Sequence, residues 1–229
     1  MLNTYIGGFY IMKSYKAVLF DLDGTLIDTS KGVIDCIKLT IDALKLKPLS
    51  MDAILRFIGP PLQYSFEKEC NLTGSDIDLA VKTFRTFYTG DNLFNVEIYG
   101  GIFELLELLK SNNIMVAVAT YKQEAFANTL LEHVGIAKYC DYIYGSDKEG
   151  LLTKADIVQK CIDSFGVDNS NVVLIGDSSY DAIGSKNANV DFIAVTYGFG
   201  FKSTDDAMQY NNVYVADTVY DIIRVLNLK

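Results

Sequence analysis

The sequence predicts an α/β fold, a Rossmann-like open parallel sheet core with a helical cap domain inserted after the first strand. Short apolar runs bounded by turn residues alternate with helical patterns along most of the chain. Because these runs are continuously apolar, they are typical of strands that are covered on both faces. One long interval, residues 29–96, contains helical patterns and no strand candidate. Strand–helix alternation with a single helical interruption indicates a parallel sheet that carries an insert.

The core elements follow in order along the chain. Continuous apolar runs predict strands at 17–20, 114–119, 141–144, 172–175, 192–195 and 213–215. Apolar residues at three- and four-residue spacing predict helices at 102–110, 122–134, 154–165, 179–187 and 218–226. The insert begins with a helix, because apolar residues recur at helical spacing from the capping candidates Thr29 and Ser30 until Pro48. Further helical patterns cover 51–57, 61–70 and 76–88.

These patterns divide the chain into an N-terminal extension (1–14), a core (15–28 and 97–229) and a cap (29–96), with hinges at 28–30 and 96–101. The extension is moderately apolar, but it lacks a basic region and a small-residue cleavage site. It therefore does not match a secretory signal, and Met12 is a second candidate start.

Composition excludes several classes of partner. The 229-residue chain has a formal net charge of -9 and no basic run, so we expect neither nucleic acid nor an anionic membrane surface as a partner. No apolar run approaches the roughly 18 residues that span a bilayer. The cysteines are widely spaced and form no C-x-x-C pair. Such spacing is typical of reduced thiols and predicts a cytoplasmic location.

The single histidine, His133, lies at the end of a predicted helix just before Gly135. An imidazole there favours the helix dipole, and the glycine supplies a cap. One histidine leaves no room for a multi-histidine metal site and makes a Ser-His-Asp hydrolase improbable.

Asp21 and Asp23 follow the first expected strand in the segment Phe-Asp-Leu-Asp-Gly-Thr-Leu. In an extended chain residues two apart share a face, so both carboxylates project from the carboxyl end of the strand, where open α/β sheets bind ligands. Gly24 allows a sharp turn and exposes backbone amides. Two carboxylates this close resist joint ionisation. The pair is therefore expected either to bind a metal or to divide into a charged and a protonated group.

Asp177 and Asp181 place further carboxylates at the end of another core strand. They lie about one helical turn apart, so both side chains can lean towards one point if a helix starts near Ser178. Acidic residues in a first helical turn also favour the helix dipole. Joined to Asp21 and Asp23, however, they are better explained by a shared cation, and hard carboxylate oxygens favour Mg²⁺ over zinc.

Thr120 and Lys154 are candidate ligands of an anion. Thr120 ends a core strand before Tyr121 and Lys122, and its hydroxyl suits either an anionic oxygen or an ordinary helix cap. Lys154 begins a predicted helix and is placed to neutralise a phosphate. Taken alone, a lysine in this position is more typical of a solvated surface.

Together these motifs resemble the haloacid dehalogenase superfamily of phosphohydrolases. The similarity runs through four motifs in the family's order and spacing: residues 21–26, Thr120, Lys154, and residues 176–177 with Asp181. It covers essentially the whole chain from Lys16, and the insert stands where that family carries its first-type helical cap. Within the superfamily, the chain is most similar to phosphoglycolate-phosphatase-like enzymes, some of which are labelled nucleotide phosphatases.

The resemblance implies a magnesium-dependent phosphatase that acts on a small phosphate monoester through an aspartyl-phosphate. Asp21 is then the nucleophile, and Asp23 is the general acid and afterwards the general base. The implied phosphate-binding residues are Gly24, Thr120, Tyr121 and Lys154. The implied ligands of Mg²⁺ are Asp21, Asp23 through its backbone carbonyl, and Asp177. Asp181 supports the metal site or orients Lys154.

The cap is expected to close over the site and exclude water. Its candidate substrate contacts are Arg56 and the loop 59–61, including Gly59, and Lys122 is a further candidate from the core. Two departures from the family pattern indicate a different inner pocket. Tyr121 stands where many relatives carry a small residue, and Ser178 stands where many carry arginine.

Several alternatives stay open, among them a nucleotide 5'-phosphatase, a pyrophosphatase and a β-phosphoglucomutase-like mutase. Similar mutases carry a cap histidine at the position of Val33, which favours hydrolysis here. Dehalogenases lack the second aspartate, so Asp23 argues against that chemistry. A phospho-acceptor switch has no use for a cap, and no G-x-G-x-x-G follows the first strand to bind a dinucleotide. We expect a small phosphorylated metabolite as the partner and a monomer or homodimer.

Overall fold

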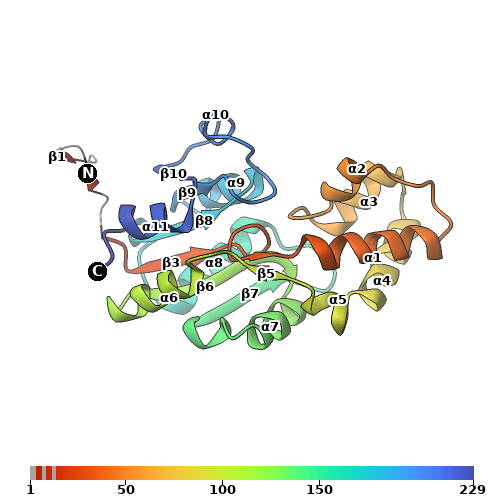
Figure 1. Cartoon of the computed structure of the whole chain (residues 1–229), viewed down its shortest axis with the longest axis horizontal. Helices are drawn as coiled ribbons and strands as arrows, with labels where there is room; N and C mark the ends of the chain where they lie inside the picture. The colour runs from red at the N-terminus through yellow and green to blue at the C-terminus, as the bar shows by residue number, and fades with distance from the viewer. Residues whose placement is uncertain (1–3, 7–8, 12–13) are drawn as a thin grey trace.

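The core is an open parallel sheet. The computed structural model describes residues 4–6, 9–11 and 14–229. Among these residues, six parallel strands form the central sheet in the order β10-β9-β8-β3-β6-β7 (Figure 1). The strands are β3 (Ala17–Phe20), β6 (Met115–Gln123), β7 (Tyr142–Ser146), β8 (Val172–Gly176), β9 (Asp191–Val195) and β10 (Tyr214–Ala216). The predicted fold class and the predicted strands are therefore confirmed.

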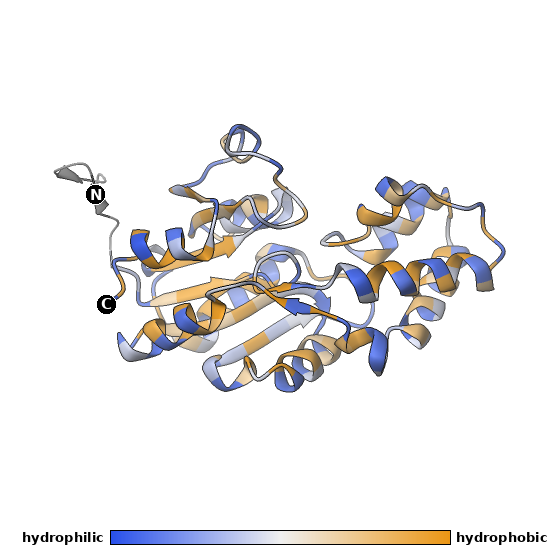
Figure 2. Ribbon diagram, viewed as in Figure 1, coloured by the Kyte–Doolittle hydropathy of each residue, from blue (hydrophilic) through white to orange (hydrophobic). Residues whose placement is uncertain are grey.

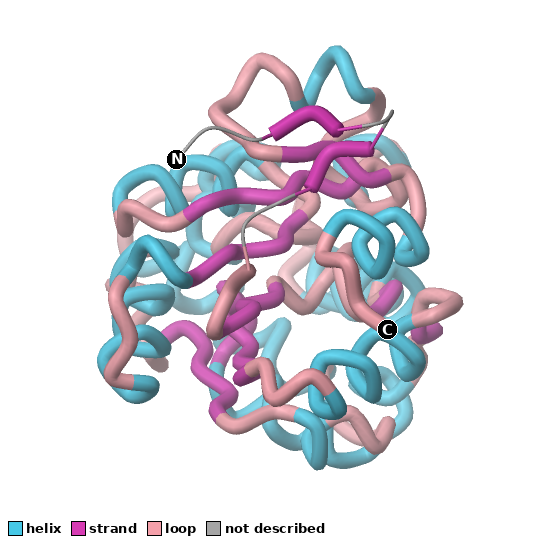
Figure 3. Tube along the Cα trace, turned by 90° about the vertical axis from the view of Figure 1, so that its left-hand side faces the viewer, coloured by secondary structure: helices cyan, strands magenta, loops and turns pink. Residues whose placement is uncertain are grey.

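Helices cover both faces of this sheet. On one face lie α6 (Ile102–Ser111), α7 (Glu124–His133) and α11 (Val219–Val225), and on the other lie α8 (Lys154–Phe165) and α9 (Ser179–Asn187). In Figure 3 the strands run through the middle of the molecule with helices on either side. Alternate residues of β3 enter two separate apolar clusters, Val18 and Phe20 on one face and Ala17 and Leu19 on the other. This two-sided burial explains why the strand sequences are continuously apolar.

The cap lies at one end of the core. It consists of α1 (Ser30–Ala43), α2 (Met51–Leu55), α3 (Leu62–Cys70), α4 (Ser75–Phe87) and α5 (Asp91–Phe94), drawn on the right in Figure 1. In Figure 2 these helices carry both hydrophilic and hydrophobic stretches, as expected for helices with one buried face. The helical insert was thus predicted correctly, apart from the short helix α5.

The connection between cap and core differs from the prediction. Both chain crossings contain a strand, β4 (Ile27–Asp28) and β5 (Glu97–Ile98), which pair antiparallel. Two residues are too few to show the alternation that marks a strand in a sequence. The hinges at 28–30 and 96–101 therefore begin as a short two-stranded ribbon.

Of two predicted helix starts, the first is correct in position but lacks its side-chain cap bond, and the second is wrong. Thr29 occupies the N-cap position of α1 but makes no side-chain cap bond, and the Asp28 carboxylate instead accepts the Ser30 N–H at 2.8 Å. The helix expected from residue 122 begins at Glu124, because β6 continues to Gln123. The Thr29 hydroxyl, which was expected to cap the helix, instead donates a hydrogen bond to Asp23.

The remaining elements are short. The turns η1 (Ala137–Tyr139) and η2 (Asn169–Asn171) and helix α10 (Thr204–Ala207) connect the core strands. Near the N-terminus, β1 (Thr4–Ile6) and β2 (Phe9–Ile11) pair antiparallel. Met12 lies outside the described residues, and the division of the chain into extension, core and cap stays a prediction.

His133 ends α7, as predicted, and its ring stacks on Phe94 of the cap with the ring centroids 3.8 Å apart. Cys36, Cys70, Cys140 and Cys161 are all free thiols. Within the described part of the chain, every helix is too short or too polar to cross a membrane.

We expect Gly32→Ala to destabilise the cap. A β-carbon at this position in α1 would lie 2.0 Å from the backbone carbonyl oxygen of Asn92. The overpacking is expected to lower the free energy of unfolding by about 1–3 kcal/mol, although alanine is about 1 kcal/mol better than glycine inside a helix. Thermal unfolding measures the change. Lys38→Ala, at an exposed position of the same helix, is the control, and equal stability of the two variants would contradict the packing argument.

Candidate active site

The site lies at the carboxyl ends of three adjacent strands. β3 is paired on one side with β8 and on the other with β6. Because parallel strands end at the same edge of a sheet, Asp21 after β3, Asp177 after β8 and Thr120 near the end of β6 come together there. This edge faces the cap (Figure 1).

Lys154 joins two of the aspartates. Its ammonium lies 2.6 Å from Asp21 Oδ1 and 2.7 Å from Asp181 Oδ1, and only 2% of the lysine is exposed. The interpretation of Lys154 as a solvated surface lysine is therefore wrong. The Oδ2 atom of Asp181 accepts the N–H and the hydroxyl of Ser178 in a capping box at the start of α9. Both oxygens of Asp181 are thus occupied, which fixes the carboxylate that holds Lys154.

Asp177 is held by a segment that the sequence analysis missed. Its Oδ2 atom accepts the backbone N–H of Phe199 at 2.6 Å and of Gly200 at 3.0 Å. Glycines let the backbone approach this closely, since a β-carbon on Gly24 or Gly198 would lie 2.3 or 2.4 Å from the same oxygen. Gly24 also has a φ of 86°, which disfavours other residues. The signal available in the sequence was a Gly-Phe-Gly segment after a core strand.

The carboxylates fit a divalent cation. Oxygens of Asp21, Asp177 and Asp181 lie within 4.8 Å of one another, and all three residues are buried. Oxygens on opposite sides of Mg²⁺ lie about 4.2 Å apart, since each bond is about 2.1 Å. When all three carboxylates are ionised, the single Lys154 ammonium leaves the cluster with a net charge of about −2. Burial, with the charges of Asp181 and Asp21, raises the pKa of Asp177 to about 8. Burial, partly offset by Lys154, raises the pKa of Asp21 to about 7.

Asp23 belongs to a second ion pair. Its carboxylate accepts hydrogen bonds from the Lys122 ammonium at 2.8 and 3.1 Å and from the Thr29 hydroxyl at 2.5 Å. Asp21 and Asp23 therefore pair with different lysines, Asp21 with Lys154 and Asp23 with Lys122. The role of Thr29 was not predicted, since its position before α1 suggested a helix cap.

Thr120 and Tyr121 support the two lysines. Thr120 is buried and its hydroxyl accepts the Lys122 N–H at 3.1 Å, whereas the N-cap of α7 is Gln123. The helix-cap interpretation of Thr120 is therefore wrong. The Tyr121 hydroxyl accepts the backbone N–H of Lys154 at 2.9 Å. Tyr121 thus holds the start of α8, and with it the base of the buried lysine.

The predicted cap contacts separate into two places. Gly59 and Lys122 line one cavity together with Asp23. Arg56 instead lines a different cleft between cap and core, and its guanidinium binds the Glu69 carboxylate at 2.8 and 2.7 Å. A contact between Arg56 and substrate stays a prediction.

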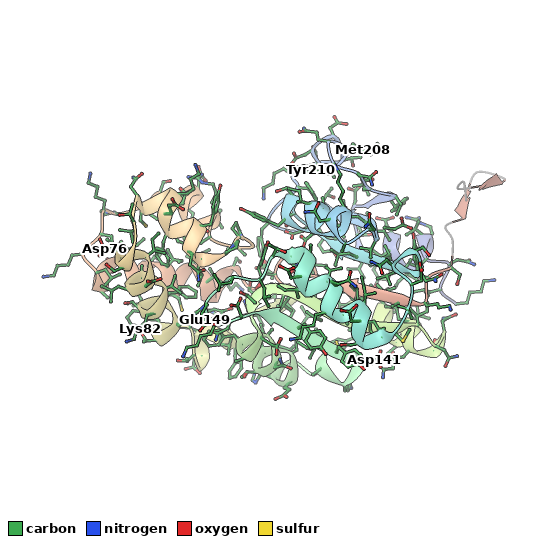
Figure 4. All side chains as sticks on the ribbon, turned by 180° about the vertical axis from the view of Figure 1, so that it is seen from behind. Asp76, Lys82, Asp141, Glu149, Met208 and Tyr210 are labelled. Atoms are coloured by element: carbon green, nitrogen blue, oxygen red, sulfur yellow. The ribbon has the colours of Figure 1, made fainter. Side chains whose placement is uncertain are left out.

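The cap is closed against the core. Gln63 and Arg85 of the cap donate hydrogen bonds of 3.1 and 2.8 Å to the carbonyl oxygens of Glu149 and Lys148. Figure 4 shows Glu149 where the two parts of the molecule meet. Both cap residues also line the cavity beside Asp23.

We expect Asp177→Asn to stabilise the fold when a chelator removes divalent cations. The pKa of Asp177 rises from an ordinary value near 3.8 to about 8. The contribution of the Asp177 carboxyl to folding stability is therefore fully present below pH 4 and is lost as the pH rises through 8. At pH 9 the variant should melt at least roughly 2–4 °C above the wild type, the effect of about 1 kcal/mol.

Thermal unfolding from pH 5 to 9 measures this difference, which should widen with pH. Added Mg²⁺ should raise the melting temperature of the wild type more than that of the variant. Asp42→Asn, at an exposed position of α1, is the control. A wild type that gains stability towards pH 9 in chelator would contradict the charge argument.

Comparison with known proteins identifies the family. A family model described as haloacid dehalogenase-like hydrolase matches residues 18–195. A 5'-nucleotidase of Pseudomonas aeruginosa is 31% identical over 204 residues, which cover 89% of this chain and 92% of that protein. A phosphoglycolate phosphatase of Agrobacterium fabrum is 32% identical over 188 residues, covering 79% and 80%.

Solved structures agree with this relationship. A predicted phosphatase from Clostridium acetobutylicum is 32% identical and superposes with a TM-score of 0.88, over 94% of this chain and all of that one. The chain therefore belongs to the haloacid dehalogenase-like hydrolase family.

Proposed function

We propose that this protein is a magnesium-dependent phosphatase that hydrolyses a small phosphate monoester through an aspartyl-phosphate. The observation that carries the proposal is the separation of two buried ion pairs. Asp21 lies with Lys154 at the carboxylate cluster, and Asp23 lies with Lys122 at the cavity. One carboxylate is thus placed to attack phosphorus and the other to exchange protons with the leaving group. The phosphatase names of several relatives support the reaction class.

In the first step, an oxygen of Asp21 forms a bond to phosphorus while the bond to the ester oxygen breaks. Asp23, in its protonated form, gives its proton to the departing alkoxide. In the second step, Asp23 takes a proton from water, whose oxygen attacks phosphorus and releases Asp21. The phosphoryl oxygens are held by Lys154 and the Thr120 hydroxyl. Asp21 and Asp177, with the backbone carbonyl of Asp23, would hold Mg²⁺, which would offset the repulsion between carboxylate and phosphate.

Asp181 serves as a positioning residue in this scheme. Its oxygens are already occupied by Lys154 and Ser178. It therefore orients the lysine that binds phosphate, which is the second of the two roles considered for it.

Hydrolysis is favoured over phosphoryl transfer between sugars. Val33 of the cap lines the same cavity as Asp23, and an apolar side chain there supplies no second proton donor or acceptor. The proposed substrate class is that of phosphoglycolate-phosphatase-like enzymes, with a nucleotide 5'-phosphatase as the alternative that the Pseudomonas relative suggests. We further propose a cytoplasmic monomer or homodimer that acts on a small phosphorylated metabolite.

Asp21→Asn is expected to lower kcat for phosphate release by at least about 1,000-fold, because the amide cannot act as the nucleophile. Phosphate release is measured with Mg²⁺ over a panel of 2-phosphoglycolate, nucleoside monophosphates, sugar phosphates and pyrophosphate. Chelation should abolish the activity of the wild type, and Mg²⁺ should restore it. Asp42→Asn should retain full activity.

The covalent step has its own readout. Rapid acid quench with a ³²P-labelled substrate should leave label on the wild type that hydroxylamine removes, as expected of an acyl phosphate, and no label on Asp21→Asn. A wild type that turns over without labelled protein at any quench time would refute the aspartyl-phosphate. Stable labelling without phosphate release would instead indicate a phospho-acceptor switch.

A further inference from the structure

The cavity beside Asp23 is mostly apolar and lies between the cap and the core. Its walls include Val33, Phe57 and Phe84 from the cap and Phe126 from the core helix α7. Asp23 is the proposed donor of a proton to the leaving group, so this cavity is where the leaving alcohol of the substrate lies. Selection among substrates therefore depends on the few polar groups that face it.

Tyr88 is a polar residue of this cavity with no assigned role. It follows helix α4 in the cap, and its ring is fixed by a stacked contact with Phe84 at 5.2 Å and an edge contact with Phe126 at 5.6 Å between centroids. The residue is 2% exposed, and its hydroxyl makes no hydrogen bond with the described residues. A buried hydroxyl without a partner is costly, by about 1–3 kcal/mol. Native proteins rarely keep such a group without a reason.

The Lys122 ammonium next to Tyr88 offers no acceptor for the hydroxyl proton. The Lys122 ammonium lies 4.9 Å from the centre of the Tyr88 ring and donates to both oxygens of Asp23. An ammonium has three N–H donors and no acceptor, so it cannot accept the hydroxyl proton of Tyr88. Burial raises the pKa of Tyr88 above its ordinary value, so the hydroxyl keeps its proton. The Tyr88 hydroxyl and the Lys122 ammonium can thus both donate a hydrogen bond to an acceptor oxygen in the cavity.

We propose that Tyr88 is a substrate-binding residue that, with Lys122, recognises an acceptor oxygen in the leaving alcohol. The ligand class is a phosphate ester of a small alcohol that carries a carboxylate or hydroxyl oxygen close to the ester carbon. Asp23 contacts the ester oxygen of such a substrate, and Tyr88 contacts the second oxygen. Because Tyr88 belongs to the cap and Lys122 to the core, this contact forms only when the cap is closed. The inference rests on the proposed phosphatase function and adds a residue that selects the substrate.

The test compares Tyr88→Phe with the wild type on three phosphate esters. The phenylalanine keeps the ring contacts and removes only the hydroxyl. For 2-phosphoglycolate and glycerol 3-phosphate, kcat/KM should fall by about 10- to 100-fold, the effect of one hydrogen bond between a neutral donor and a charged or polar acceptor. For ethyl phosphate, whose alcohol carries no oxygen besides the ester oxygen, kcat/KM should change by less than about 3-fold. The two acceptor-bearing esters show whether a carboxylate or a hydroxyl is preferred.

A second readout separates binding from structure. Because the hydroxyl makes no hydrogen bond with the described residues, Tyr88→Phe should melt at or above the temperature of the wild type. Tyr139→Phe is the matched control, since that hydroxyl donates a hydrogen bond to the exposed Glu107. This variant should leave the ratios of kcat/KM between the three esters unchanged. An equal loss on all three esters, no loss on any, or a lower melting temperature of Tyr88→Phe would overturn the proposal for Tyr88 alone. A wild type that releases phosphate from no ester would refute the phosphatase function itself.

Discussion

The arrangement of the site depends on the buried ammonium of Lys154. It joins Asp21, which follows strand β3, to Asp181 in helix α9, and so ties the central strand to the helices on one face of the sheet. Removing one member of a buried ion pair leaves an unpaired charge and typically costs about 3–5 kcal/mol. These positions are therefore constrained by stability as well as by chemistry.

One lysine cannot neutralise three buried carboxylates, and Asp177 is stabilised by hydrogen bonds instead of an ion pair. Backbone N–H groups of Phe199 and Gly200 bind Asp177, and the glycines around it let the chain come close enough to do so. The cluster still carries excess negative charge, which a divalent cation would neutralise. The same excess of negative charge thus favours metal binding and destabilises the metal-free protein.

The second ion pair connects chemistry to the cap. Lys122 and Thr29 fix the Asp23 carboxylate, and Thr29 is also the residue from which the first cap helix begins. Next to Lys122 lies Tyr88, the residue that follows cap helix α4. Closure of the cap therefore assembles the surroundings of the group that exchanges protons with the leaving alcohol. Activity and substrate selection are coupled through the same few contacts.

The fold class, the core strands, the helical insert and the candidate aspartates could be predicted from the sequence alone. These features are local, because apolar runs and acidic residues at strand ends depend on neighbours within a few positions. The partner of each charged side chain is known only from the folded structure. That structure buried Lys154, assigned Lys122 and Thr29 to Asp23, brought the Gly-Phe-Gly segment to Asp177 and paired the short strands β4 and β5. Those contacts join residues distant in the chain, and long-range pairing of buried charges leaves no periodic trace in a sequence.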